Sequence, residues 1–275
     1  MKLSVNDSKR SSLTLFYWKL CKRVLSQIQQ PVIDMAEHID PEHLKTRVAG
    51  LMKGDKMKEM IDSLWISVGS TFASEMSRKM LLMKLGIHKQ ERSEIQLKQD
   101  LSSIDYWEDY FRRYTRERSQ KITEEIMDGQ ARIVNDLIDK VLEEGKLGGL
   151  GIPEIGRQMR TDLMDGLTEI NKYQAERIAR TEVLGASDKG SFEAARESGV
   201  NPKKLWSTSG LPNIRETHIQ YEEEDLKTGG RDMDEEYAAG LQYPHDPDGA
   251  PEEIINCRCT IIYDVDEGAG RGAYF

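Results

Sequence analysis

Hydrophobic positions recur every three or four residues through most of the first half of the chain, which is typical of amphipathic α-helices. The clearest series begins after Asp55, a residue type that caps helix N-termini, and Gly86 is its predicted end. Its apolar members are Met57, Met60, Ile61, Leu64, Trp65, Val68, Phe72, Met76 and Met80. We expect these side chains to form core, although a methionine-rich stripe is also an adaptable partner-binding face.

Further helices are predicted on both sides of a glycine-rich stretch. Asp40-Pro41 puts proline at the first position of one helix, and an apolar series from Phe111 to Val141 predicts another. Residues 145–151 contain four glycines and are expected to be a linker. Beyond the linker, a short helix from Pro153 to about Leu163 and a longer one from Thr168 to Ser198 are predicted.

Alternation of apolar and polar residues replaces the helical period near the C-terminus. Residues 204–208 predict one strand and residues 254–263 a second, separated by about 45 residues dense in Gly, Pro, Asp and Glu. A loop of that length is normally functional or disordered. The predicted architecture is mainly α, with an extended helical N-terminal region (1–145), a linker (146–152), a small α+β domain with a short β-sheet (153–265) and a flexible tail (266–275).

Charge is distributed unevenly along the chain, whose net charge is −9. The first 127 residues hold 22 Lys and Arg against 18 Asp and Glu, and the remaining residues hold 17 against 30. This division indicates two modules with different neighbours and argues against wholesale coating of nucleic acid. No window approaches the roughly 18 apolar residues of a membrane span. No signal peptide is recognised, so synthesis and use in a cytoplasm are expected.

Two of the three cysteines lie in the predicted second strand, where the period of two puts Cys257 and Cys259 on one face. Their Cα atoms would lie roughly 6.5–7 Å apart, which is too far for a relaxed disulfide but suits two thiolates on one metal ion. His218 and His245 complete a possible Cys2His2 set for zinc. The alternative is that both cysteines are small core residues, as Cys21 is expected to be.

Polar residues on the other face of that strand and on the preceding helix predict a structural network. We expect one or both of Arg180 and Glu182 to reach into the long loop and hold it, by pairing with Arg215, Arg258 or Asn256, because buried charges need partners. Glu182 as a catalytic residue is the alternative, but no nucleophile, base and oxyanion donor can be assembled around it, so no catalytic residue is predicted. The expected members of the network are Arg180, Glu182, Arg215, His218, Asn256 and Arg258.

Arginines interleave with aromatic residues at one place in the N-terminal half. The basic residues there are candidate DNA contacts, because binding to duplex DNA depends on cations placed against phosphates. The preferred interpretation is a helix with one apolar edge and one solvated basic face. The acidic runs Glu222–Asp225 and Asp232–Glu236 are expected to be solvated loop. The candidate DNA contacts are Arg112, Arg113, Arg116 and Arg118.

Several short motifs follow one another between about residues 150 and 265, and together they are more specific than any one alone. They are Pro153-Glu154-Ile155-Gly156-Arg157-Gln158-Met159, Ala179-Arg180-Thr181-Glu182, Lys204-Leu205-Trp206-Ser207-Thr208, Arg215-Glu216-Thr217-His218, Tyr243-Pro244-His245-Asp246-Pro247 and Asn256-Cys257-Arg258-Cys259. This series resembles the C-terminal domain of the phage Mu F-like minor head proteins, also called phage head morphogenesis proteins. The chain departs from that family at residues 209–213 and 221–224, where members usually have an Asp before the arginine of Arg-x-x-His and a Gly after its histidine.

The resemblance implies a non-enzymatic minor capsid protein of a tailed bacteriophage. Such a protein would sit inside the head near the portal vertex, after assembly in the host cytoplasm, and would aid head assembly, DNA packaging or ejection. Expected partners are the portal protein and the major capsid or scaffolding protein, with packaged double-stranded DNA as a possible further partner and no membrane involved during assembly. No cofactor is expected apart from the possible zinc. The alternatives are a metal-dependent or nucleotide-modifying enzyme delivered with the genome, and a DNA-binding packaging accessory.

Overall fold

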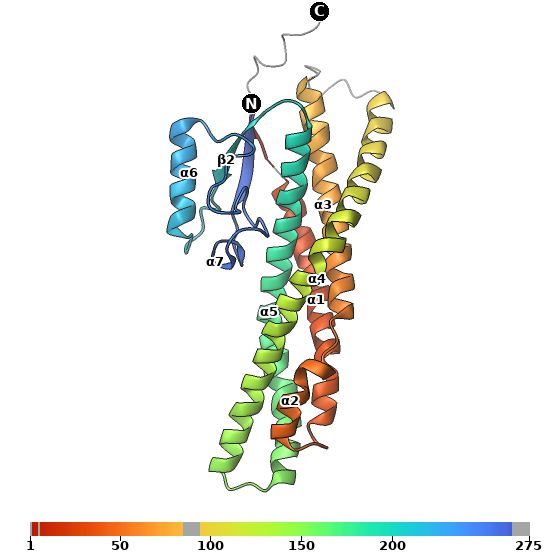
Figure 1. Ribbon diagram of the computed structural model, residues 1–275, viewed down its shortest axis with the longest axis vertical. Coiled ribbons are helices and arrows are strands. Elements are labelled where there is room, and N and C mark those ends of the chain that lie inside the picture. Colours follow the sequence, from red (N-terminus) through yellow and green to blue (C-terminus); the bar gives the residue numbers. More distant parts are fainter. Residues whose placement is uncertain (1, 5, 85–93, 266–275) are drawn as a thin grey trace, which may run out of the picture. The chain divides into compact units, whose positions relative to one another are not determined.

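The computed structural model describes residues 2–4, 6–84 and 94–265, and these form long helices with a small antiparallel sheet (Figure 1). The predicted mainly α fold class with a short sheet is confirmed. The predicted helix end at Gly86 and the predicted tail at 266–275 lie outside the described residues. In chain order the elements are β1 (Lys2–Leu3), α1 (Asp7–Met35), α2 (Pro41–Leu51), α3 (Asp55–Lys84), α4 (Glu94–Leu147), α5 (Ile152–Glu197), β2 (Lys203–Ser207), α6 (Glu216–Thr228), α7 (Pro251–Ile254) and β3 (Thr260–Asp264).

The chain divides into two compact units that do not follow its predicted order of domains. The helical unit contains residues 16–62 and 115–178, and the mixed unit contains the described residues among 1–15, 63–114 and 179–275. The glycine-rich stretch is a tight turn between α4 and α5, and each unit takes segments from both sides of it. The boundary between the units therefore does not lie at the turn. Instead, the long helices α3, α4 and α5 each contribute one part to each unit.

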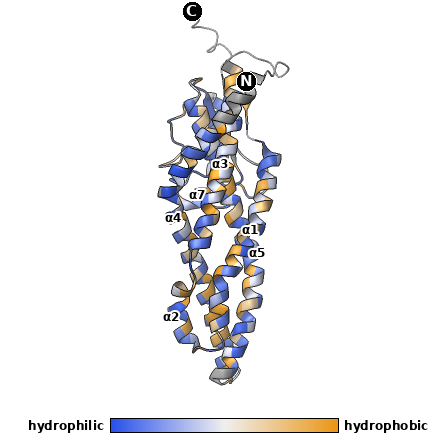
Figure 2. Ribbon diagram, turned by 90° about the vertical axis from the view of Figure 1, so that its right-hand side faces the viewer, coloured by the Kyte–Doolittle hydropathy of each residue, from blue (hydrophilic) through white to orange (hydrophobic). Residues whose placement is uncertain are grey.

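Amphipathic helices build the helical unit. Hydrophobic and hydrophilic residues lie on different sides of the helices in Figure 2, and the apolar sides supply buried residues such as Leu25, Leu44 and Ile138. Its interior also holds polar groups that satisfy one another, since the Gln29 amide donates to Gln130 at 3.0 Å. The methionine-rich series of α3, which runs through both units, is buried throughout, so its interpretation as core is confirmed.

One helix replaces the two predicted after the glycine-rich turn. Thr168, predicted as a helix cap, lies inside α5, and its hydroxyl donates to the carbonyl of Met164 at 2.7 Å. A side-chain bond to the preceding turn competes with capping and leaves the helix unbroken. Gly166 does not end the helix either, because a Cβ there would lie 3.2 Å from the Leu137 side chain, so the glycine serves close packing.

The sheet of the mixed unit has the order β1-β3-β2, with both pairs antiparallel. Trp206 of β2 lies opposite Ile261 of β3, and the Trp206 ring packs on His218 of α6 with ring centroids 4.7 Å apart. The hydroxyl of Thr260, at the start of β3, contacts Asp188 of α5 at 3.4 Å. The sheet therefore lies between α6 and α5, as Figure 1 shows.

The predicted strand at 254–263 is only half a strand. Pro251 begins the single turn α7, as a proline at the first helical position does. Asn256 then takes a left-handed conformation with φ of 59°, which asparagine tolerates better than most residues. Pairing with β2 starts at Thr260. The prediction that Cys257 and Cys259 face the interior holds, since both are buried, but Ile255 is exposed rather than packed beside them.

Two glycines let α4 and α5 approach α3 closely within the mixed unit. A Cβ on Gly190 would lie 2.3 Å from the carbonyl oxygen of Gly69, and a Cβ on Gly69 would lie 2.3 Å from the Phe111 ring. Such separations are far below van der Waals contact, so these positions require glycine. Across the described residues, no helix is long and apolar enough to span a membrane.

Candidate metal centre and surrounding polar network

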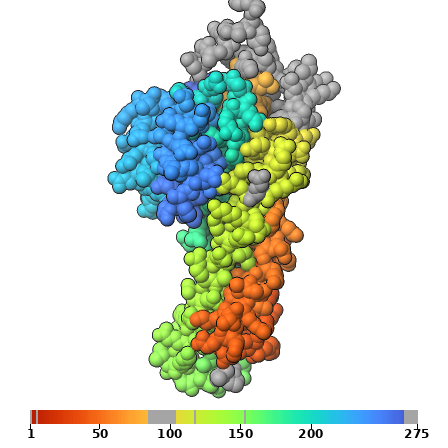
Figure 3. Space-filling model, viewed as in Figure 1, coloured from red at the N-terminus to blue at the C-terminus, as the bar shows by residue number. Residues whose placement is uncertain are grey.

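Three side chains that the sequence singled out for metal binding come together in the mixed unit. His218, Cys257 and Cys259 are all buried, and one ligand atom from each lies within 4.8 Å of the others. The Nδ1 atom of His218 is 3.3 Å from the sulfur of Cys259 and 3.6 Å from that of Cys257. His218 lies in the first turn of α6, and both cysteines lie in the segment just before β3. Figure 3 shows the residues from α6 to β3, in blue, as a continuously packed surface.

A carboxylate orients the ring of His218. Its Nε2 atom lies 2.8 Å from a carboxylate oxygen of Glu253, which also accepts a hydrogen bond from the Thr217 hydroxyl at 3.0 Å. The Trp206 ring packs against the imidazole. These contacts fix the imidazole so that Nδ1 is presented to the two sulfurs.

The fourth predicted ligand, His245, has the same kind of support. Its Nδ1 atom lies 2.9 Å from Asp188, which is fully buried and also accepts a hydrogen bond from Arg10 at 2.8 Å. Its Nε2 atom is buried and has no hydrogen-bond partner among the described residues. Burial opposes charge on His245, but Cys257 and Asp188 outweigh burial and raise the pKa of His245 to about 10.

The two thiols are unequal. The hydrogen bond with Cys259 raises the pKa of Cys257, and burial adds to the effect. The same bond lowers the pKa of Cys259, against the opposing effect of burial. In addition, the backbone amide of Cys259 donates to the Cys257 sulfur at 3.3 Å.

Part of the predicted polar network surrounds the segment just before the cysteines. The Arg180 guanidinium donates to the side-chain oxygen of Asn256, and the Thr181 hydroxyl accepts from the Asn256 amide at 3.0 Å. Arg215 donates to the carbonyl oxygen of Ile255 at 2.7 Å. These bonds hold the backbone in the left-handed turn that leads into Cys257.

Two further predicted members of the network are Glu182 and Arg258. Glu182 accepts a hydrogen bond from the Trp65 indole of α3 at 2.9 Å. Arg258 is exposed, and the described residues offer it no hydrogen bond or ion pair.

Asp225 was predicted to lie in a solvated loop, and that prediction is wrong. It is fully buried in α6 and accepts hydrogen bonds from the Trp206 amide and the Tyr237 hydroxyl, both at 2.6 Å, and from Arg231 at 3.2 Å. The neighbouring Glu222 accepts from the Thr208 amide at 2.9 Å. An acidic run on a helix gives no sign of which member faces inward, although the i, i+7 relation of His218 and Asp225 puts both on one face.

The arginines proposed for DNA lie on α4. Arg112, Arg113 and Arg116 are exposed and Arg118 is half-buried, while the interleaved Phe111 belongs to the core. Arg112 pairs with Glu108 at 3.3 Å.

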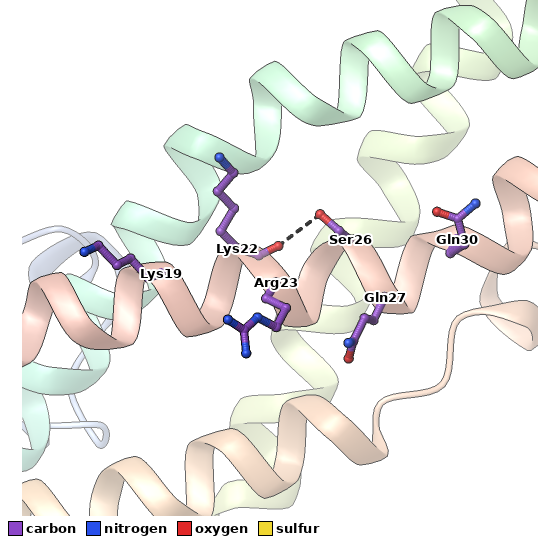
Figure 4. A pocket seen from close by; sticks show the side chains of 6 residues that line it. All are labelled: Lys19, Lys22, Arg23, Ser26, Gln27 and Gln30. Carbon is purple, nitrogen blue, oxygen red and sulfur yellow. Dashed lines mark hydrogen bonds between the residues drawn. The ribbon is translucent and has the colours of Figure 1, made fainter.

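A shallow hollow on α1 is lined by side chains of that helix alone (Figure 4). The described lining includes no histidine, cysteine or carboxylate, so the hollow has no acid–base pair to work with. Its lining residues are Lys19, Lys22, Arg23, Ser26, Gln27 and Gln30.

The fold and site together define a mainly α protein with a mixed unit that contains a small sheet and a buried Cys–His cluster. Residues 136–262 match the family described as "Phage Mu protein F like protein". The predicted resemblance of the C-terminal region to that family is therefore confirmed. The match begins earlier than the expected residue 150, within the last turns of α4, and it takes in the turn and the whole of α5.

Two curated relatives match parts of the chain. "NAD(+)--arginine ADP-ribosyltransferase EFV" of Enterococcus faecalis is 31% identical over 49% of this chain and 26% of its own length. "Uncharacterized protein YqbB" of Bacillus subtilis is 28% identical over 54% of this chain and 46% of its own length. The chain thus spans less than half the length of these relatives. No solved structure matches it.

Proposed function

We propose that this protein is a minor head protein of a tailed bacteriophage that associates with the portal inside the head and aids assembly, DNA packaging or ejection. The observation that carries the proposal is the match of residues 136–262 to the phage Mu protein F-like family, which suggests a phage head morphogenesis protein. The match runs from the end of α4 through α5 and α6 to β3 and includes the Cys–His cluster, so it concerns the C-terminal half of the chain rather than one motif.

The contacts of the site support a structural role. Each predicted polar residue with a described contact binds backbone or a neighbouring side chain, and the Cys–His cluster is buried where a substrate would not reach it. A transferase activity is printed for the Enterococcus relative, but the match covers only 26% of that protein. We therefore propose that the protein acts by binding partners and not by catalysis.

Co-purification with the portal protein tests the proposal. We expect tagged full-length chain, expressed with the portal, capsid and scaffolding proteins of the same phage, to retain the portal protein, and particles from an infected host to contain the chain. As a control, the chain with Arg180→Ala and Arg215→Ala, which loosens the segment around Asn256, should retain less portal protein. Absence of the chain from purified particles would overturn the proposal, as would turnover of a nicotinamide or nucleotide substrate that is lost on Glu182→Gln.

A further inference from the structure

We propose that His218 Nδ1, Cys257 Sγ, Cys259 Sγ and His245 Nε2 bind one Zn²⁺ ion that cross-links the mixed unit. This inference does not depend on a role in phage heads. It rests on three observations about the cluster: the spacing of the ligand atoms, the orientation of the two imidazoles, and the burial of a His245 nitrogen that has no hydrogen-bond partner among the described residues.

The spacing of the three closest ligand atoms suits a tetrahedral ion. With zinc–sulfur and zinc–nitrogen distances of about 2.3 and 2.0–2.1 Å, tetrahedral angles place sulfur and nitrogen about 3.5–3.6 Å apart. The observed separations from His218 Nδ1 are 3.3 and 3.6 Å. Two sulfurs and an imidazole nitrogen are the donors that zinc selects over magnesium or calcium.

Both histidines are held as zinc-bound histidines usually are. A metal-bound imidazole commonly donates its other N–H to a carboxylate, which fixes the tautomer and the ring. Glu253 fills this position for His218, and Asp188 fills it for His245. In each case the carboxylate binds one ring nitrogen and leaves the other available on the side of the cysteines.

The unpartnered Nε2 atom of His245 identifies the fourth ligand. A buried imidazole nitrogen without a hydrogen bond is costly, and structures rarely tolerate one without a ligand or water. His245 interacts with Cys257, so it lies beside the three-residue cluster, although outside the 4.8 Å limit that groups the other three. In the proposed site its Nε2 atom turns to the ion and completes the tetrahedron.

A site with four protein ligands and no open position is structural rather than catalytic. Its ligands come from α6, from the loop around residue 245 and from the segment before β3, and its supporting Asp188 comes from α5. The ion would therefore tie the long Gly- and Pro-rich connection to both sides of the sheet. This explains how a connection of that composition is ordered without a large apolar core.

Metal analysis of the full chain, purified with zinc present and freed of unbound ion, tests the proposal. We expect one zinc per chain, lost in Cys257→Ser and His218→Ala, and retained in the control Cys21→Ser, which replaces a buried cysteine outside the cluster. Less than a tenth of an equivalent in the wild type would overturn the proposal and leave a hydrogen-bonded Cys–His cluster.

Variants outside the ligand set keep the test decisive if ligand variants do not fold. Glu253→Gln should weaken zinc binding about 10–100-fold, as loss of a supporting carboxylate does, whereas Glu252→Gln on the same turn should leave it unchanged. Equal affinities in these two variants would contradict the proposed orientation of His218.

Cobalt substitution tests the fourth ligand. Chelator-treated wild-type protein titrated with Co²⁺ should develop the intense visible absorption of a tetrahedral thiolate site, and His245→Ala should bind zinc at least tenfold more weakly. An octahedral Co²⁺ spectrum, or unchanged affinity in His245→Ala, would overturn the four-ligand arrangement.

Discussion

Single buried charged side chains hold elements of the mixed unit together through hydrogen bonds. Asp225 is the clearest case, since its carboxylate accepts hydrogen bonds from Trp206 of β2 and from Arg231 and Tyr237 in the segment after α6. The hydrogen bond from the Trp206 amide joins α6 to the sheet in addition to their apolar contacts.

Replacing Asp225 by alanine should lower the free energy of unfolding by about 2–5 kcal/mol, because it leaves the Trp206 amide and the Tyr237 hydroxyl buried without an acceptor. The control Glu223→Ala removes an exposed carboxylate from the same helix. It should change the free energy of unfolding by less than about 0.5 kcal/mol. Denaturant unfolding followed by circular dichroism measures both, and equal effects would show that burial of Asp225 does not matter.

The lowered pKa of Lys204 leads us to expect that the stability of the protein depends on pH. Burial, with Arg231 nearby, lowers its pKa from 10.5 to about 8, so between these values the unfolded state binds more protons than the folded state. Stability contributed by this group therefore rises as pH increases from 8 towards 10.5.

The comparison of the wild type with Lys204→Met isolates that effect. From pH 7 to 9.5 the wild type should gain roughly 2 kcal/mol of unfolding free energy relative to the variant. A difference between the two proteins that stays constant with pH would contradict a depressed pKa for Lys204.

At the scale of elements, close helix contact depends on the positions of glycines. Gly190→Ala should destabilise the mixed unit by several kcal/mol, because the new Cβ would meet the Gly69 carbonyl at 2.3 Å and backbone must move. Gly129→Ala, in α4 with open space around it, should instead stabilise the protein by about 0.5–1 kcal/mol. Thermal unfolding of the two variants checks the opposite signs, and a neutral Gly190→Ala would show that the helices separate readily.

The same scale shows where local patterns succeed and fail. The apolar series of α3 is set by a period of 3.6 residues, and every predicted member is buried. The prediction of a strand at 254–263 was wrong for its first half. Pro251 and the left-handed Asn256 favour a turn there, and the alternation of apolar and polar residues does not detect it. Two predicted helices merged into α5 because packing of its apolar side outweighs a weak local stop.

At the scale of the whole molecule, the charge distribution bears on nucleic acid. The chain carries a net charge of −9, and its exposed arginines on α4 are few. We expect no salt-dependent binding to duplex DNA at about 50 mM salt, because phosphate contacts need several unopposed cations. Binding that disappears in the triple variant Arg112→Ala, Arg113→Ala and Arg116→Ala would instead establish the DNA-binding alternative; fluorescence anisotropy over a salt series measures it.

The sequence by itself determined the fold class, the methionine-rich core of α3 and the set of residues with metal-binding chemistry, because each depends on residue type and on spacing along one element. Only the tertiary structure decided which groups support that set. Arg10 and Asp188 are 178 positions apart, yet they meet beside His245. Likewise, only the fold turned Asp225 inward and Arg258 outward. Local periodicity specifies the face of a helix or strand, whereas the partner on that face is fixed by packing of segments that are distant in the chain.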